Sequence, residues 1–300
     1  MLKDFEEIRQ TVLSRKHTAR LGVIGSDETH TLEAVVRAAR DGMIVPVLFG
    51  DEEGTREKWN SLNSGLPLPE IIHCEGDEDI VKKAVTAAHD GRVDALLKGK
   101  IQTAVMLKAV LNKEWGLRTG RKLSHVMLMH IPSYHKLMFM TDGGMTTYPD
   151  LNDKVDLIHN AVDVAHKLGY EEPKVAVLSS VEYFNPKMPE NVDADALKKM
   201  NQNGEITGCI IEGPISIDLA VSKESAEIKD YHSPVAGDAD VLVMPDLPAG
   251  NIFFKSLYYF AGMSMAGVIV GASVPLSMLS RSSGADEKYY SILLAAAAAA

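Results

Sequence analysis

Residues 20–50 read RLGVIGSDETHTLEAVVRAARDGMIVPVLFG, and this stretch decides the fold. A short apolar run ends at Gly25, a stretch with helical periodicity covers 31–40, and a second apolar run covers 44–50. Short apolar strands that alternate with helices of ten or more residues are typical of βαβ units and a parallel sheet. Right-handed crossovers place helices on both faces of such a sheet. The sequence therefore predicts an α/β fold.

The same alternation extends along most of the chain. Further strands are predicted over 70–74, 95–100, 174–179, 210–214, 239–245 and 268–276. Further helices are predicted over 4–16, 52–63, 79–89, 103–112, 156–168, 193–201, 252–259 and 289–294. The exception is 124–141, where two apolar runs predict an antiparallel pair that ends before Asp142-Gly143-Gly144.

A chain of 300 residues is long enough for two domains. The break at Asp142-Gly143-Gly144 is the candidate crossing point between them. We expect a first domain of residues 1–140 plus 274–300, to which a C-terminal strand and helix return, and a second domain of residues 141–273.

The composition is that of a globular protein, with 46% apolar and 24% charged residues. A net charge of −10 without any basic run argues against a nucleic-acid partner. Apolar runs stay below the ~18 residues that a membrane helix needs, and the first residues lack a signal core, so no membrane partner is expected. Cys74 and Cys209 lie in apolar runs, as reduced and buried thiols of a cytoplasmic protein do.

The stretch 279–288 reads LSRSSGADEK and follows the apolar run 268–276. Ser283 and Asp286 fit a capping box, which predicts a helix N-terminus here, with free N–H groups that favour an anion. Arg281 adds a planar fork that matches phosphate oxygens, and Asp286 and Glu287 add carboxylates. Together they suit a reaction in which phosphate leaves while a proton is removed. The alternative is an ordinary capped helix with a solvated arginine.

Two other stretches combine a strand end with the start of a helix, the place where ligands bind in open α/β sheets. In 244–255, Gly250 allows close backbone approach, Asn251 is a candidate helix cap, and Lys255 lies one turn further on. In 97–103, Lys98 and Lys100 are candidate phosphate ligands. A plain strand-to-helix turn and solvated lysines are the simpler interpretations of these two stretches.

Several motifs of other enzymes are absent from the sequence. Gly99-Lys100 is not part of a P-loop, and no Gly-x-Gly-x-x-Gly, Gly-x-Ser-x-Gly, His-Glu-x-x-His or Cys-x-x-Cys occurs. A metal- and nicotinamide-dependent dehydrogenase would need a carboxylate cluster. The only aspartates four residues apart, Asp90 and Asp94, flank Gly91 and indicate a turn. No metal site is predicted.

The three stretches together resemble the phosphate acetyl/butyryltransferase family. The resemblance rests on the Pro245-Asp246-x-x-x-Gly250-Asn251 loop and on Ser280-Arg281, which are fairly specific as a pair, and it runs through most of the chain. Residues 32–35 and the step from Gly42 to Pro46 also resemble the first domain of the family. The ending 288–292, KYYSI, is more similar to the butyryl branch than to the acetyl branch.

The resemblance implies a two-domain α/β/α architecture similar to isocitrate and isopropylmalate dehydrogenases, with the active site in the interdomain cleft. It implies a cytoplasmic homodimer or higher homo-oligomer that transfers a short acyl group between coenzyme A and inorganic phosphate through an acyl phosphate. Coenzyme A is then a substrate, and no permanently bound cofactor is expected. A phosphate acetyltransferase and a non-catalytic protein that binds coenzyme A or phosphate are the alternatives.

The resemblance also assigns site residues. Ser280 and Arg281 match the catalytic Ser-Arg pair of the family, and Glu287 stands where the acetyl branch has its catalytic aspartate. This departure leaves open whether Asp286 or Glu287 is the base. Phosphate or coenzyme A contacts are expected from the residues of the other two stretches, namely Gly250, Asn251, Lys255, Lys98 and Lys100.

Overall fold

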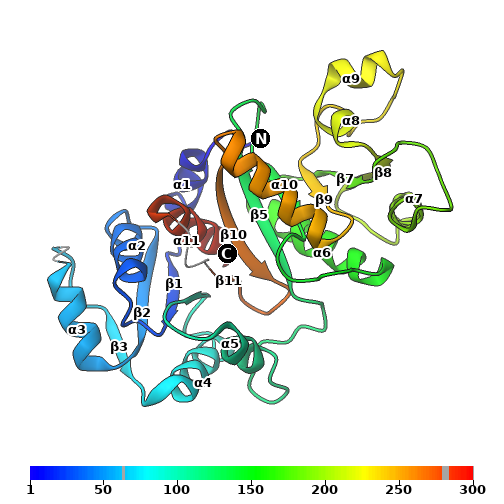
Figure 1. The fold of residues 1–300 in the computed structure, drawn as a ribbon. Helices are drawn as coiled ribbons and strands as arrows, with labels where there is room; N and C mark the ends of the chain where they lie inside the picture. The colour runs from blue at the N-terminus through cyan, green and yellow to red at the C-terminus, as the bar shows by residue number, and fades with distance from the viewer. Residues whose placement is uncertain (63–64, 279–283, 300) are drawn as a thin grey trace. The chain divides into compact units, whose positions relative to one another are not determined.

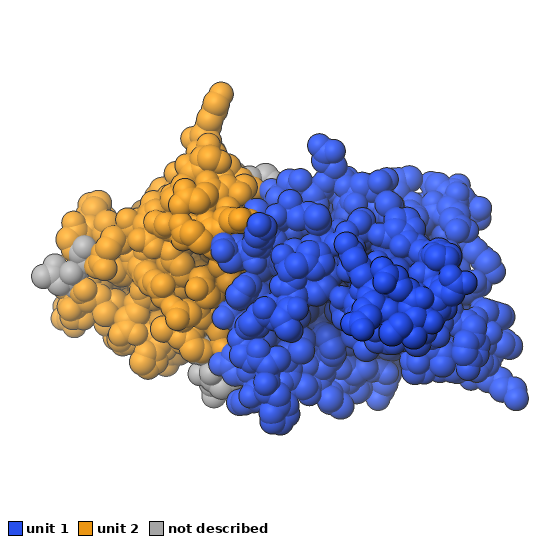
Figure 2. Space-filling model, turned by 90° about the horizontal axis from the view of Figure 1, so that it is seen from above, with its two compact units in different colours: residues 1–4, 122–265 blue, residues 5–121, 266–300 orange. Residues whose placement is uncertain are grey.

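The structure, a computed structural model, describes residues 1–62, 65–278 and 284–299. The chain forms two compact units, each built from separated segments (Figure 1, Figure 2). Unit 1 comprises residues 1–4 and 122–265, and unit 2 comprises residues 5–121 and 266–300. None of the helices in the described ranges is both long and apolar enough to span a bilayer.

Unit 2 is built on a mainly parallel sheet with the strand order β3-β2-β1-β4-β11-β10. Its strands are β1 (Ala19–Ile24), β2 (Ile44–Gly50), β3 (Glu70–His73), β4 (Ala95–Lys98), β10 (Ser264–Val270) and β11 (Leu276–Ser277). β11 pairs in parallel with β4, through Leu276 and Leu96, and antiparallel with β10. The C-terminal strand thus returns to the sheet that the N-terminal segments build.

The helices of unit 2 form two packed groups on this sheet. They are α1 (Phe5–Leu13), α2 (Thr29–Arg40), α3 (Glu52–Ser61), α4 (Gly76–His89), α5 (Thr103–Val110) and α11 (Ala285–Ala299). α11 packs against α1 and α2, whereas α4 packs against α5 (Figure 1). In α2, Leu32, Val35 and Val36 recur at helical spacing and are buried, which explains why this segment is a helix on the sheet.

Unit 1 contains a second sheet segment with the strand order β5-β6-β9-β7-β8. Its strands are β5 (Ser124–His130), β6 (Met138–Thr141), β7 (Lys174–Leu178), β8 (Ile210–Ile215) and β9 (Val241–Val243). Its helices are α6 (Leu151–Lys167), α7 (Pro189–Gln202), α8 (Ile217–Val221), α9 (Lys223–Ile228) and α10 (Leu247–Phe260). β5 and β6 pair antiparallel, as predicted, and the other neighbouring strands pair in parallel.

The unit boundaries differ from the expected domain boundaries at 140 and 274, because they fall at 121/122 and 265/266. The reason is the pairing of β6 with β9, where Phe139 lies opposite Val241 and ties the β5–β6 hairpin to unit 1. The predicted strand 268–276 is also divided, since the chain reverses at Gly271, whose φ is 96°, between β10 and β11. Cys74 and Cys209 are free and buried, as expected.

Candidate active site

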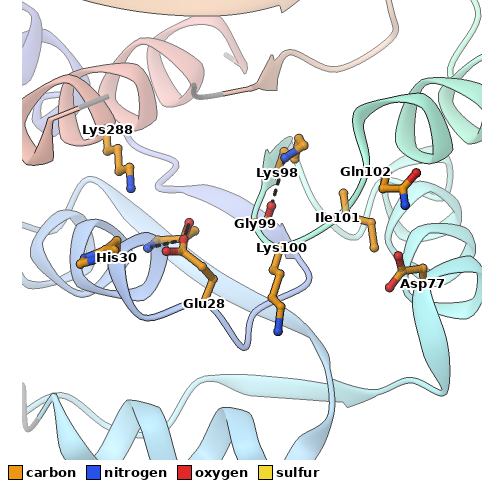
Figure 3. Close-up of a pocket in the computed structure, with 10 residues that line it drawn as sticks. Glu28, His30, Asp77, Lys98, Gly99, Lys100, Ile101, Gln102 and Lys288 are labelled. Carbon is orange, nitrogen blue, oxygen red and sulfur yellow. Dashed lines mark hydrogen bonds between the residues drawn. The ribbon is translucent and has the colours of Figure 1, made fainter. Parts of the chain in front are cut away.

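Unit 2 contains a pocket of about 570 Å³ where β1 and β4 end and α2 and α5 begin (Figure 3). Its lining residues come from the start of α2, the β4–α5 connection, and single positions on α4 and α11. They are Glu28, His30, Thr31, Asp77, Lys98, Gly99, Lys100, Ile101, Gln102 and Lys288. All of them belong to unit 2, so this unit alone forms the pocket.

Gly99 brings the end of β4 against the end of β1 under this pocket. Its N–H donates to the carbonyl of Ile24 at 2.8 Å, and the N–H of Lys100 donates to the carbonyl of Gly25 at 3.0 Å. A Cβ atom at residue 99 would lie 2.3 Å from the oxygen of Gly25, closer than any side chain tolerates. Glycine is therefore required here for the two strand ends to meet.

Three lysines from distant parts of the sequence line the pocket. Lys98 ends β4 and donates through Nζ to the carbonyl of Gly99 at 3.2 Å. Lys100 pairs with Asp27, with 3.2 Å between Nζ and Oδ2, and Lys288 extends from the first turn of α11 (Figure 3). The N-terminus of α5, where Gln102 is the N-cap residue but its side chain makes no capping hydrogen bond, adds partial positive charge. The pocket is therefore suited to an anionic ligand.

A carboxylate on the α2 side of the pocket counters part of this charge. Glu28 is the N-cap residue of α2 and accepts from the N–H of Thr31 at 2.9 Å and from the Thr31 hydroxyl. Partial burial opposes ionisation, but the Thr31 hydrogen bonds and the charge of Lys288 hold the pKa of Glu28 below its ordinary value. Glu28 and Lys288 thus place opposite charges at the same pocket.

The first turn of α11 directs its side chains in different directions. The Asp286 carboxylate pairs with Arg37 of α2, with 2.5 Å between Oδ1 and Nη1. Arg37 also lies 3.9 Å from the ring centroid of Tyr289, whose hydroxyl donates to Asp41 at 2.5 Å. Burial and the Asp41 carboxylate raise the pKa of Tyr289 to about 12. Asp286 therefore belongs to a contact between α11 and α2.

Glu287 is half-buried and lies between Asp286 and Lys288 on the helix. No hydrogen bond or ion pair holds its carboxylate within the described ranges of the chain. Ser283 of the expected capping box lies outside the described residues. Its expected partner, Asp286, pairs with Arg37.

The structure brings together some predicted site residues and leaves others apart. Lys98 and Lys100 share the pocket with Lys288, the neighbour of Glu287. Ser280 and Arg281 lie outside the described residues. Gly250, Asn251 and Lys255 belong to unit 1, where all three lie on α10.

The expected cap of α10 is corrected by the structure. The helix begins at Leu247, and Asp246 is its N-cap residue, with its carboxylate accepting from the N–H of Ala249 at 2.8 Å. Asn251 therefore lies within the helix rather than at its cap. The close approach that Gly250 allows is between α10 and the backbone at Asp142, since a Cβ atom at residue 250 would lie 3.0 Å from the Asp142 carbonyl oxygen.

The sequence analysis missed Glu28, His30, Thr31 and Asp77 as lining residues. Glu28, His30 and Thr31 follow β1, and Asp77 follows β3. The available signal was their position just beyond the carboxyl ends of predicted parallel strands. No group of three or more His, Cys, Asp or Glu side chains arranged to hold a metal ion occurs in the part of the chain that the structure describes.

Comparison with known proteins assigns this architecture to a family. The family model described as "Phosphate acetyl/butaryl transferase" matches residues 69–296. The chain belongs to the phosphate acetyl/butyryltransferase family. This confirms the resemblance inferred from the Ser-Arg and Pro-Asp-x-x-x-Gly-Asn stretches.

Individual relatives come from both branches of the family. The chain is 42% identical to a phosphate acetyltransferase of Thermotoga maritima, over 95% of this chain and 96% of the relative. It is 43% identical to a probable phosphate butyryltransferase of Bacillus subtilis, over 92% of this chain and 91% of the relative. Overall identity therefore does not separate the acetyl from the butyryl branch.

A solved structure confirms the α/β fold class. The crystal structure of a branched-chain phosphotransacylase from Enterococcus faecalis V583 matches with a TM-score of 0.83 at 32% identity. The match covers 94% of this chain and 99% of that one. The chain thus shares its fold with that structure over nearly its whole length.

Proposed function

We propose that this family member is an acyltransferase that interconverts acyl-CoA plus phosphate with acyl phosphate plus CoA, and that it prefers a short acyl group such as butyryl. The central observation is the pocket of unit 2, where Lys288 of the C-terminal helix meets Lys98 and Lys100 of the β4–α5 connection. These cations and the start of α5 suit the phosphate groups that both substrates carry.

The proposed reaction begins with the thiol of CoA. A thiol with a pKa of about 8.5 is mostly protonated at neutral pH, so a base that removes its proton accelerates the attack. Glu287 is the proposed base, because its carboxylate has no partner in the described part of the chain and adjoins Lys288 of the pocket. Assistance of this kind is typically worth about 10²–10⁴-fold in rate.

The thiolate then attacks the acyl carbon of the acyl phosphate, the C–O bond to phosphate breaks, and the thioester forms. Phosphate leaves with the electron pair of that bond. Ser280 and Arg281, which the family resemblance assigns to catalysis, are proposed to stabilise the developing oxyanion and the leaving phosphate. Arg281 would hold the phosphate with two parallel hydrogen bonds, which a lysine cannot do.

Several features of this proposal rest on the family rather than on the pocket. Gly250, Asn251 and Lys255 of α10 are proposed to contact CoA or phosphate, and Asp286 is retained as the alternative base. The enzyme is proposed to be a cytoplasmic homo-oligomer that uses CoA as a substrate, with no permanently bound cofactor or metal. Free and buried cysteines support a reducing compartment.

A phosphate acetyltransferase is the second candidate function, because the Thermotoga maritima relative at 42% identity carries that name. A non-catalytic protein that binds CoA is the third. The butyryl-like ending 288–292 favours the first candidate over the second.

One assay separates these candidates. Purified protein is mixed with acyl-CoA and phosphate, without metal or nicotinamide, and the release of free thiol is followed in parallel reactions with acetyl-, propionyl-, butyryl- and isobutyryl-CoA. The proposal predicts thiol release that depends on phosphate, with a higher kcat/KM for butyryl-CoA than for acetyl-CoA. The reverse order would favour the acetyltransferase, and no thiol release with any acyl-CoA would favour a binding protein.

A further inference from the structure

Tyr289 joins the first turn of α11, which carries Glu287 and Lys288, to the C-terminal end of α2. The residue is only 4% exposed, and its hydroxyl donates to the Asp41 carboxylate at 2.5 Å. Asp41 is the C-cap residue of α2, so this hydrogen bond connects two helices that pack against each other (Figure 1). The proposed base and a pocket lysine therefore directly precede a residue that is fixed to a neighbouring helix.

Asp41 occupies a position that disfavours a carboxylate on its own. The C-terminal end of a helix carries partial negative charge, which stabilises cations and opposes anions. Two groups from other helices offset this effect, namely the Tyr289 hydroxyl of α11 and the Arg9 guanidinium of α1, whose Nε lies 3.9 Å from Oδ2 of Asp41. Three helices thus meet at this carboxylate, which serves as the acceptor that holds Tyr289.

The orientation of the Tyr289 side chain is defined at both its hydroxyl and its ring. Burial and the Asp41 carboxylate raise the pKa of Tyr289 to about 12, so the hydroxyl keeps its proton at neutral pH and remains a donor. The Arg37 guanidinium lies 3.9 Å from the centroid of the ring, within the range of a cation–π contact.

The rest of α11 is held by contacts that do not involve its first turn. Residues 291–298 are buried, and the N–H of Gly267 in β10 donates to the Ser291 hydroxyl at 3.0 Å. Near the C-terminal end of the helix, Arg15 donates to two backbone carbonyls at 3.1 and 2.9 Å. The first turn begins with exposed residues, so its placement depends on the contacts that it makes with α2, among which the Tyr289 hydrogen bond is the most enclosed.

We propose that Tyr289 is a positioning residue for acyl transfer, and that its hydrogen bond to Asp41 sets the direction in which the Glu287 carboxylate meets the thiol of CoA. The inference rests on the proposed function, because that function assigns the base to Glu287. Successive helical residues differ by about 100°, so a rotation of this turn moves the carboxylate away from the proton that it removes. A misplacement of about 1 Å costs on the order of 10²-fold in rate.

The ion pair between Asp286 and Arg37 on the same turn is less suited to this role. Its carboxylate and guanidinium are 70% and 46% exposed, and exposed pairs contribute little. The Asp41 side chain is 31% exposed and accepts its hydrogen bond from a buried residue, Tyr289. Hydrogen bonds to an ionised group are stronger than those between neutral groups.

Steady-state kinetics with butyryl phosphate and CoA test the role of the hydroxyl. Tyr289→Phe removes the hydroxyl and keeps the ring, and kcat is expected to fall about 10-fold or more. Tyr290→Phe is the matched control and should keep the parental kcat. The Tyr290 ring stacks on Phe5 at 4.2 Å, and its hydroxyl makes no hydrogen bond within the ranges of the chain that are described. Asp41→Asn, which keeps an acceptor for Tyr289, should retain a higher kcat than Asp41→Ala.

Coupling to Glu287 separates positioning from a purely structural role. In a Glu287→Gln background no base remains to be positioned, so Tyr289→Phe should change kcat there by less than about twofold. A structural defect would lower kcat by the same factor in both backgrounds, and thermal unfolding of each variant shows whether it is folded at the assay temperature.

The outcomes distinguish this inference from the proposed function. A parental chain that consumes no thiol with butyryl phosphate would overturn the proposed function and the inference with it. Parental turnover that is unchanged in Tyr289→Phe, that falls equally in Tyr290→Phe, or that falls by the same factor with and without the Glu287 carboxylate would overturn the inference alone.

Discussion

Consecutive residues of α11 have different surroundings, because each helical residue is rotated by about 100° from the one before. Asp286 contacts Arg37 on α2, Lys288 reaches the pocket, and Glu287 lies between them. Two adjacent carboxylates therefore have separate roles, a structural one for Asp286 and the proposed catalytic one for Glu287.

Paired substitutions test this division. Glu287→Gln should reduce kcat about 10²–10⁴-fold, because it removes the proposed base while it keeps the side-chain shape. Asp286→Asn should leave kcat nearly unchanged and cost at most ~1 kcal/mol of unfolding free energy, since the pair with Arg37 is 70% and 46% exposed on its two sides. Steady-state kinetics and urea unfolding measure both quantities. The opposite pattern would identify Asp286 as the base.

At the scale of single residues, a short stretch of sequence predicted that Lys98 and Lys100 are anion ligands, because they lie between a strand and a helix. Both line the pocket, and their role as ligands remains a proposal. Glu28 and Thr31 were missed, because their distance from Lys288 depends on how three strand ends and two helices meet. No local pattern encodes that arrangement.

Among the elements, the contact between the ends of β1 and β4 depends on Gly99. Gly99→Ala should destabilise the protein by about 1–3 kcal/mol or more, because the new methyl group meets the Gly25 and Ile24 carbonyl oxygens rather than a flexible side chain. Displacement of the two strand ends by the new methyl group should also reduce activity, because Lys98 and Lys100 flank residue 99. Urea unfolding of the variant provides the measurement, and parental stability would mean that the two strand ends do not meet as described.

A cluster of charges joins the β5–β6 connection to β9 within unit 1. The Asp238 carboxylate pairs with Lys136 at 2.9 Å, Lys174 at 2.5 Å and His135 at 2.9 Å. Lys136 also pairs with Asp240 at 2.5 Å, and both of these side chains are buried. Burial opposes ionisation of Asp238, but the hydrogen bonds from Lys174, Lys136 and His135 hold its pKa well below the ordinary value.

The lowered pKa of Asp238 makes the stability of the protein depend on pH in the acid range. A carboxylate whose pKa is lowered by folding stabilises the protein above its unfolded pKa, and that contribution is lost as the pH falls below about 4. Asp238→Asn should therefore be less stable at pH 7 and should show a smaller further loss between about pH 5 and pH 2 than the parental chain. Thermal unfolding across that range is the measurement, with the exposed Asp90→Asn as control. Equal pH slopes for parent and Asp238→Asn would contradict the assignment.

The order of elements was largely predictable, because short apolar strands and amphipathic helices differ in period. The errors lie where local signals compete. Pro248 lies near the start of α10 and is compatible with the first helical turn, so the helix begins at Leu247 rather than at 252. The apolar run 268–276 continues through a reversal at Gly271, and periodicity alone does not reveal that turn.

For the whole molecule, the two-unit organisation followed from length and from the break in pattern at Asp142-Gly143-Gly144. The boundaries did not, because the β5–β6 hairpin carries the same apolar pattern whichever sheet it joins. Its assignment to unit 1 rests on pairing between residues about 100 positions apart, which a sequence pattern does not report.

The proposed preference for one acyl chain length is a prediction about the whole molecule. An extra buried methylene is worth about 0.8 kcal/mol, or about fourfold in kcat/KM, so the proposed preference for C3–C5 groups should be graded. A series from acetyl- to valeryl-CoA should give a kcat/KM that rises and then falls, with its maximum at butyryl-CoA or a neighbouring length. A maximum at acetyl-CoA would contradict the proposed substrate.

The most direct test of the account is whether the pocket of unit 2 serves phosphate acyl transfer. Initial rates with butyryl-CoA and phosphate are compared for the parental chain, Lys98→Ala, Lys288→Ala and Lys108→Ala, the last an exposed lysine on α5 outside the pocket. A lost charge-assisted hydrogen bond costs about 1.5–3 kcal/mol, so the two pocket variants should raise KM for phosphate or CoA about 10- to 100-fold. Lys108→Ala should match the parent. Unchanged KM values for both pocket variants would contradict the account.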